Sequence, residues 1–150
     1  QRAFETIGYA KVSTSAEEAR RMGLLRPSDA VSMNRERLVA EAKLTALELA
    51  RSYQPGAPRT DIRVAGQTGL AALQMGIYLA RQGGYISEHD TVVAGKLAHI
   101  LTGGRLTGEP RVSEQYLLDL EREAFLSLCG QRKTQERMQH LLKTGKPLRN

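Results

Sequence analysis

Apolar residues recur at intervals of three and four along most of the chain, which is the spacing that places side chains on one face of an α-helix. The clearest example is the stretch 113–130, whose shared face carries Leu117, Leu120, Ala124 and Leu128. Further helices are expected at 16–23, 35–53, 67–83, 87–103 and 133–144. The pattern therefore predicts an all-α fold, an irregular bundle of about six helices, with residues 4–11 as the tail of a helix that begins upstream.

Capping residues mark the predicted helix ends. Ser15 with Glu18, and Ser87 with Asp90, fit the capping box, in which two side chains satisfy backbone N–H groups reciprocally. Asn34 and Ser113 are the predicted N-caps of two further helices. The predicted stops are glycines, which adopt the left-handed backbone that often ends a helix: Gly23, Gly83-Gly84, Gly103-Gly104, Gly130 and Gly145.

The apolar periodicity also predicts which positions of four other helices share a face or are buried. These positions are Leu38, Ala42, Ala46, Leu49 and Tyr53; Leu70, Leu73 and Ile77; Val93, Leu97 and Ile100; and Met138, Leu141 and Leu142. The second and third sets form a helical hairpin from 67 to 103.

A stretch rich in proline and glycine suggests how the chain is divided. Residues 55–66 read as a linker between the regions 1–54 and 67–150, because Pro55, Gly56 and Pro58 interrupt helical periodicity. Within the linker, residues 61–64 alternate as a short extended segment would.

Composition adds the compartment and the position of the charge. The chain has 150 residues, a net charge of +6 and a single cysteine, Cys129, so no internal disulfide is possible and a reducing, cytoplasmic compartment is expected. No apolar run reaches the roughly 18 residues of a membrane span. Residues 131–150 hold six basic groups and one acidic group, which favours phosphates or an acidic partner surface as ligands of this tail. A solvated basic terminus is the alternative explanation of the same charges.

Motifs that carry chemistry are missing from the sequence. There is no dinucleotide fingerprint, phosphate-binding loop or zinc-ligand spacing, and no metal ligand is predicted. His89-Asp90 fits the first turn of a helix better than a metal site, with Asp90 in the capping box of Ser87. The hairpin resembles a DNA-binding helix-turn-helix only superficially, because its second helix offers Lys96 as its one fixed cation. Binding of nucleic acid through the basic tail stays open as an alternative.

Two strings resemble the crotonase family. The first runs from Phe4 to Ala19 and on through Met22 to Leu25, around the family's "SA-x-EA-x-x-x-GL" stretch, where the chain leaves the catalytic core. The second runs from Leu118 to Phe125 and continues at Leu142 to Asn150. It looks like the end of the hydratase part of bacterial 3-hydroxyacyl-CoA dehydrogenases fused to an enoyl-CoA hydratase, enzymes of fatty-acid β-oxidation.

The resemblance implies a parent enzyme that hydrates an enoyl-CoA thioester and oxidises the product with NAD. The family's acid–base glutamates and nucleotide-binding domain precede the first string, so no catalytic residue and no cofactor are carried over to this segment. Independently, the sequence starts with neither an initiator methionine nor a signal pattern, so Gln1 is expected to be a cut within a longer polypeptide. Residues 30–150 exceed the usual helical tail of the crotonase family, which leaves open whether this tail forms trimers as others do.

The implied role is that of a non-catalytic helical segment that supports assembly and closes the acyl-CoA site. The expected partners are the remainder of its own polypeptide, further copies in a homo-oligomer, and acyl-CoA. Because the family's last helices help to close this site, Lys143, Lys146 and Arg149 are predicted to contact the phosphates of CoA. The alternative function is a basic helical module that binds nucleic acid or protein.

Overall fold

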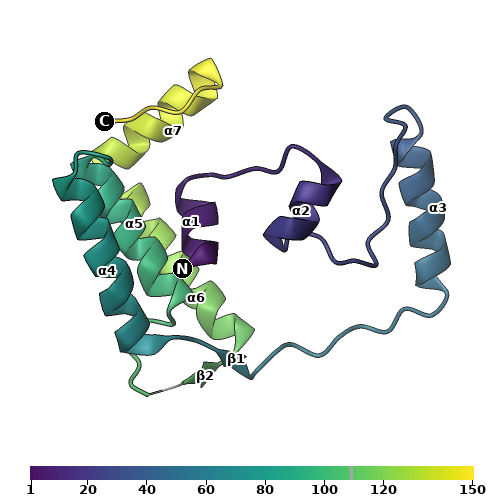
Figure 1. Cartoon of the computed structure of the whole chain (residues 1–150), viewed down its shortest axis with the longest axis horizontal. Helices are drawn as coiled ribbons and strands as arrows, with labels where there is room; N and C mark the ends of the chain where they lie inside the picture. The colour runs from purple at the N-terminus through teal and green to yellow at the C-terminus, as the bar shows by residue number, and fades with distance from the viewer. Residues whose placement is uncertain (109) are drawn as a thin grey trace. The chain divides into compact units, whose positions relative to one another are not determined.

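The computed structural model describes residues 1–108 and 110–150, and over these residues the chain is all-α, as the sequence predicts (Figure 1). It has seven helices and two strands of two residues each within those ranges. In chain order the elements are α1 (Arg2–Gly8), α2 (Ala16–Met22), α3 (Leu38–Ala50), β1 (Ile62–Arg63), α4 (Gly66–Gln82), α5 (Glu88–Leu101), β2 (Arg111–Val112), α6 (Glu114–Cys129) and α7 (Arg132–Thr144). Six of these helices match the six predicted ones. The additional helix is α1, which lies in the segment 4–11 that was expected to be the tail of a helix.

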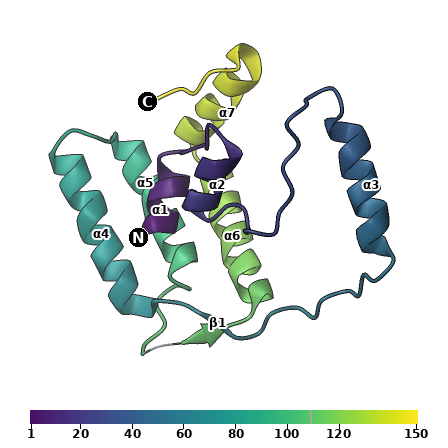
Figure 2. The ribbon, with the colours of Figure 1, turned by 45° about the vertical axis from the view of Figure 1, so that its right-hand side comes forward.

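The chain forms two compact units, one of residues 1–10 with 58–150 and one of residues 11–57. In the first unit α5 is the central helix, since it packs against α4, α6 and α1, while α7 packs against α6. Figure 2 shows α4 and α5 as neighbouring helices joined by a short loop, which confirms the predicted hairpin.

The core of the first unit lies between α4 and α5. Leu70, Ile77 and Ala98 are buried there, with Phe4, Leu73, Ile86 and Ala94 packed against them. The predicted apolar face of α4 is thus confirmed. On α5, however, Val93, Leu97 and Ile100 are only half-buried, and the fully buried position is Ala98. A small side chain at that position lets the neighbouring helix approach α5 closely.

Serine caps determine where several helices begin. Ser113 Oγ accepts from the backbone N–H of Tyr116 at 3.1 Å, and Ser87 forms a complete capping box with Asp90, as predicted. Ser15 Oγ likewise accepts from the N–H of Glu18. The carboxylate of Glu18, however, accepts from the backbone N–H and hydroxyl of Thr14, at 2.7 and 2.6 Å, and not from Ser15 as expected. Thr14 offers Glu18 two donors, its backbone N–H and its hydroxyl, whereas the backbone of Ser15 would offer one.

One predicted helix start needs correction. Asn34 closes a turn, accepting from the N–H of Glu36, so α3 starts only at Leu38. The predicted stops at Gly83-Gly84 and Gly145 are confirmed, with Gly84 and Gly145 in the left-handed conformation. Gly130 also ends its helix, but with ordinary right-handed backbone.

The faces predicted for two helices also differ from the observed packing. Of the three positions predicted to be buried on α7, Leu141 and Leu142 are exposed and Met138 is half-buried. The contacts of this helix with the polar start of α5 are made by Thr134 and Arg137 instead. In the second unit α2 buries Ala19, but α3 has no buried residue, so Leu38, Leu49 and Tyr53 are exposed.

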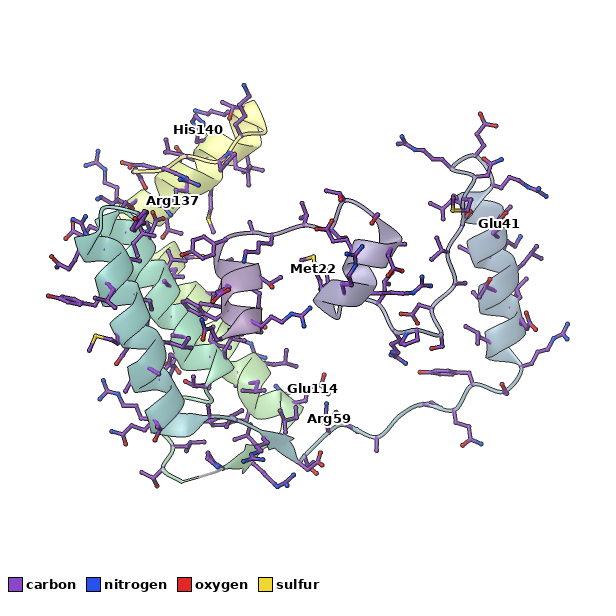
Figure 3. All side chains as sticks on the ribbon, in the orientation of Figure 1. Met22, Glu41, Arg59, Glu114, Arg137 and His140 are labelled. Atoms are coloured by element: carbon purple, nitrogen blue, oxygen red, sulfur yellow. The ribbon has the colours of Figure 1, made fainter. Side chains whose placement is uncertain are left out.

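A network of backbone hydrogen bonds, the backbone clasp, ties residues 59–67 to residues 102–114. Strands β1 and β2 pair antiparallel, with Ile62 opposite Val112. The clasp also includes the bonds from Gln67 N to Leu106 O, at 2.7 Å, and from Glu114 N to Arg59 O, at 2.8 Å (Figure 3). It confirms the predicted extended segment at 61–64 and fixes the loop between α5 and α6 at the start of α4.

Candidate functional site

The three predicted phosphate-binding cations lie at the end of the first unit. Lys143 is in the last turn of α7, Lys146 follows the left-handed Gly145, and Arg149 lies in the final segment. All three are exposed, and no ion pair with another described residue involves them. They are therefore accessible to an anion.

The tail turns back along α7 instead of continuing away from it (Figure 1). Thr144 fixes the turn, because its hydroxyl donates to His140 O and accepts from the N–H of Lys146 at 3.1 Å. Further along, Asn150 Nδ2 donates to Glu136 Oε2 at 2.9 Å. Lys143 and Lys146 thus lie on either side of Gly145, at the C-terminal end of α7. Asn150, the residue after Arg149, is held roughly two turns further back, about 10 Å along the axis.

The docking of the tail depends on Arg137, which lies midway along α7 (Figure 3). Its Nε donates to Asn150 Oδ1 at 2.8 Å, and its Nη1 donates to Asp90 Oδ1 at 2.7 Å. Asp90 also accepts from the N–H of Ser87 in the capping box of α5. One guanidinium therefore connects the last residue of the sequence with the first turn of α5.

The charge of Asp90 is stabilised by these contacts. Burial alone would raise the pKa of Asp90, but hydrogen bonds from Ser87 and Arg137 and the positive charge of Arg137 outweigh it, so the pKa is lowered. The carboxylate is thus held ionised against the guanidinium, and the ion pair joins α7 to the first turn of α5.

His89 forms the second contact between the same two helices. It is buried, and its Nε2 lies 2.9 Å from Thr134 Oγ1 on α7. Burial lowers the pKa of His89, and the nearby cations Arg137 and Lys133 lower it further. The contact between the His89 imidazole and the Thr134 hydroxyl therefore joins the two helices and has a structural role. Among the described residues no three His, Cys, Asp or Glu side chains gather as metal ligands would.

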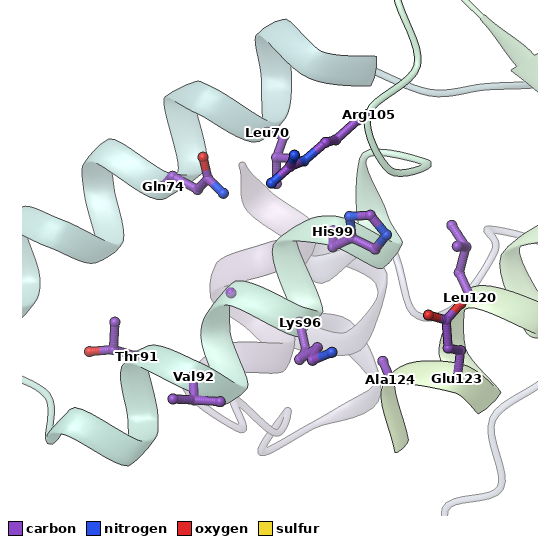
Figure 4. Close-up of a pocket in the computed structure, with 11 residues that line it drawn as sticks. Leu70, Gln74, Thr91, Val92, Lys96, His99, Arg105, Leu120, Glu123 and Ala124 are labelled. Carbon is purple, nitrogen blue, oxygen red and sulfur yellow. The ribbon is translucent and has the colours of Figure 1, made fainter. Parts of the chain in front are cut away.

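An open hollow lies between α4, α5 and α6 (Figure 4). Its volume is about 440 Å³, which is within the range of small-molecule sites. Leu70, Leu120 and Ala124 are among its apolar lining residues. Its polar lining comprises Gln74, Thr91, Lys96, His99, Arg105 and Glu123. This hollow is a second place where the fold collects groups that could hold a ligand.

The sequence predicts the residues of the tail but not those that line the hollow. Lys143, Lys146 and Arg149 were predicted from the charge of the tail together with the family resemblance. The hollow escapes prediction because Lys96, His99 and Arg105 become neighbours of α4 and α6 only after the helices pack. The capping box predicts the role of Asp90 at the start of its helix. No spacing along the chain predicts that Arg137, 47 positions later, is the partner of Asp90.

Comparison with known proteins gives one informative match. The chain is 48% identical over 147 residues to a protein of Bacillus subtilis (strain 168) named "Probable 3-hydroxyacyl-CoA dehydrogenase". The match covers 98% of this chain but only 19% of that relative. No protein-family model matches the chain. No solved structure matches it either. The chain is therefore similar to a segment that makes up about a fifth of a dehydrogenase.

Proposed function

We propose that this chain is a non-catalytic helical segment of a cytoplasmic 3-hydroxyacyl-CoA dehydrogenase fused to an enoyl-CoA hydratase, and that it supports assembly and closure of the acyl-CoA site. One observation carries the proposal, the 48% identity over nearly the whole chain to a small part of a dehydrogenase. NAD and the CoA thioester would be ligands of the whole enzyme. Within this segment only the tail would contact substrate.

The tail supports the part of the proposal that concerns CoA. Lys143 and Lys146 are exposed near the end of α7, and CoA carries a pyrophosphate and a 3′-phosphate that such cations bind well. Arg149, displaced along α7, would contact a different phosphate from the other two. This division matches a ligand whose phosphate groups are spread over several ångströms.

Helix α3 supports the part that concerns assembly. Apolar residues surround most of its circumference: at about 100° per residue, Leu38 and Leu49 point to one side and Leu44 and Leu47 to roughly the opposite side. A helix that is apolar on several faces is stable when other elements cover it. We infer that the remainder of the longer polypeptide, which would make up most of the enzyme, covers α3.

Calorimetric titration with CoA, at low and physiological salt, tests the proposal. The chain should bind CoA, and Lys146→Ala with Arg149→Ala should weaken binding at least about tenfold, because a hydrogen bond to a charged group contributes roughly 1.5–3 kcal/mol. The matched control is Arg81→Ala, which removes an exposed cation from α4. Equal affinities of the tail variant and the control would contradict the role of the tail.

The basic tail also favours one competing function, the binding of nucleic acid without sequence preference. A parallel titration with a single-stranded oligonucleotide separates the two functions. Oligonucleotide binding that falls steeply with salt, together with no response to CoA, would replace the CoA proposal, since counterion release dominates such contacts.

A further inference from the structure

We propose that the hollow between α4, α5 and α6 binds a small molecule that carries one oxyanion group, a phosphate or a carboxylate, on an apolar body. The site lies on other helices than the tail, so it goes beyond the proposed function and stands independently of it. Cations, apolar residues and a single carboxylate line the hollow.

Three nitrogen-bearing side chains from consecutive parts of the chain line the hollow. Lys96 and His99 are three residues apart on α5, so they lie on one face, about one turn from each other. Arg105 follows the two left-handed residues Gly103 and Gly104, which turn the chain back after α5. These three side chains make no hydrogen bond or ion pair with any other residue in the described ranges, 1–108 and 110–150.

The local backbone leaves room for these groups. A Cβ atom added at Gly104 would lie 3.2 Å from His99 Cε1, so the imidazole rests directly against the main chain of the loop. Any larger residue at Gly104 would push the ring away or close the space beside it. The loop therefore places the imidazole and the Arg105 side chain beside the same opening (Figure 4).

The apolar lining of the hollow suggests the rest of the ligand. Val92 is 38% exposed and Leu120 is half-buried, so both present apolar surface to the hollow, with the buried Leu70 and Ala124 behind them. An apolar body would cover this surface and leave its charged end beside the cations. An ion contact beside an apolar floor is also less screened than one in open solvent.

Glu123 limits the charge that the hollow accepts. It is the one carboxylate among the lining residues, on α6, and it is exposed. Against the fixed cations Lys96 and Arg105 it leaves an excess of one positive charge, which suits a single anionic group. Gln74 on α4 and Thr91 on α5 offer further hydrogen bonds to the ligand.

The experiment is a titration of the ¹⁵N-labelled chain at low salt, followed by amide chemical shifts, with inorganic phosphate and with hexanoate as separate probes. We expect shifts concentrated in residues 91–105 with either probe, and the stronger response identifies the class of oxyanion. Lys96→Met with Arg105→Met should weaken this response at least about fivefold, because it removes both fixed cations and keeps chain length. Arg105→Met alone, on an exposed loop residue, keeps the test informative if the double variant does not fold.

A tail variant, Lys143→Met with Lys146→Met, is the matched control and should respond in residues 91–105 as the unmodified chain does. Absence of shifts in this segment with both probes would overturn the proposal, as would equal responses from the hollow variant and the tail variant. Because the CoA titration reports on the tail, either proposal can fail without the other.

Discussion

Arg137 and Asp90 are 47 positions apart in the sequence, yet Nη1 of the arginine lies 2.7 Å from Oδ1 of the aspartate. Their side chains are only 22% and 28% exposed. Because Asp90 belongs to the capping box of α5 and Arg137 also holds Asn150, the pair connects helix capping, helix packing and tail docking. The position of the tail thus depends on Arg137, which is not one of the three residues predicted to bind phosphate.

Replacing Arg137 with alanine should lower the free energy of unfolding by about 2 kcal/mol, since it leaves a partly buried carboxylate and an amide without their donor. Urea denaturation of Arg137→Ala, Asp90→Ala and the double variant measures the coupling, expected at roughly 0.5–3 kcal/mol. The control pair is Arg122 and Asp119, whose side chains are 66% and 52% exposed and whose coupling should stay below about 1 kcal/mol. Equal coupling in the two pairs would contradict a special role for Arg137.

The stability of the first unit should fall as the pH falls through the unfolded pKa of histidine, which is 6.5. Burial lowers the pKa of His89, so the unfolded chain binds a proton that the folded chain does not, and stability decreases on acidification. Thermal unfolding between pH 7.5 and 5.5 measures this loss. His89→Gln should make the melting temperature less dependent on pH in this range, whereas an unchanged slope would show that another group is responsible.

A second loss is expected at lower pH, from Asp90. The pKa of Asp90 is lowered in the folded chain, so its contribution is fully present above its unfolded value of 3.8 and is lost as the pH falls below that value. In Arg137→Ala the pKa of Asp90 should move upward, and the acid transition with it. NMR titration of the Asp90 carboxyl carbon measures the shift directly.

Two glycines of α4 should respond oppositely to the same substitution. Gly66 has a φ of +56°, and an added Cβ would collide with Leu106 O, so Gly66→Ala should destabilise the backbone clasp by more than about 1 kcal/mol. Gly76 lies within the same helix and faces open space, so Gly76→Ala should stabilise by roughly 0.5–1 kcal/mol. Chemical denaturation of both variants gives the comparison, and effects of the same sign would refute the assigned backbone strain.

Helix α3 should make the isolated chain prone to self-association, because its leucines are exposed on opposite sides. Leu44 and Leu47 are 67% and 57% exposed, so Leu44→Glu with Leu47→Glu should reduce association without loss of buried packing. Sedimentation velocity at increasing protein concentration measures the effect. The comparable change on α7, Leu142→Glu, serves as the control, and an equal reduction there would mean that α3 has no particular part in association.

The sequence predicts local structure well where caps and periodicity act together. Ser87, Ser113 and Gly145 mark their helix ends correctly because the relevant hydrogen bonds or backbone angles depend on a few neighbouring residues. The same local rules fail for Asn34, which caps a turn four residues before the helix begins at Leu38. A capping side chain indicates that a backbone N–H is satisfied, but not that a helix follows.

Packing between distant elements is less accessible to sequence reasoning. The apolar pattern of α7 predicted that Leu141 and Leu142 would be buried, but both are exposed. The helix packs against α6 and contacts the polar start of α5 through Thr134 and Arg137. For the candidate sites, the tail was predicted from its charge together with the family resemblance. The hollow requires knowledge of which helices become neighbours, and no pattern along the chain contains that.

The backbone clasp has a consequence for how this segment can change during evolution. Its hydrogen bonds use main-chain atoms, so most side chains between residues 59 and 67, and in the partner segment, are free to vary without losing them. The exceptions are Gly66 and Gly103, where an added Cβ would strike Leu106 and Val64 respectively. In diverged relatives of this segment we therefore expect two fixed glycines within otherwise variable loops, a signature by which the fold could be traced after the helices have lost their similarity.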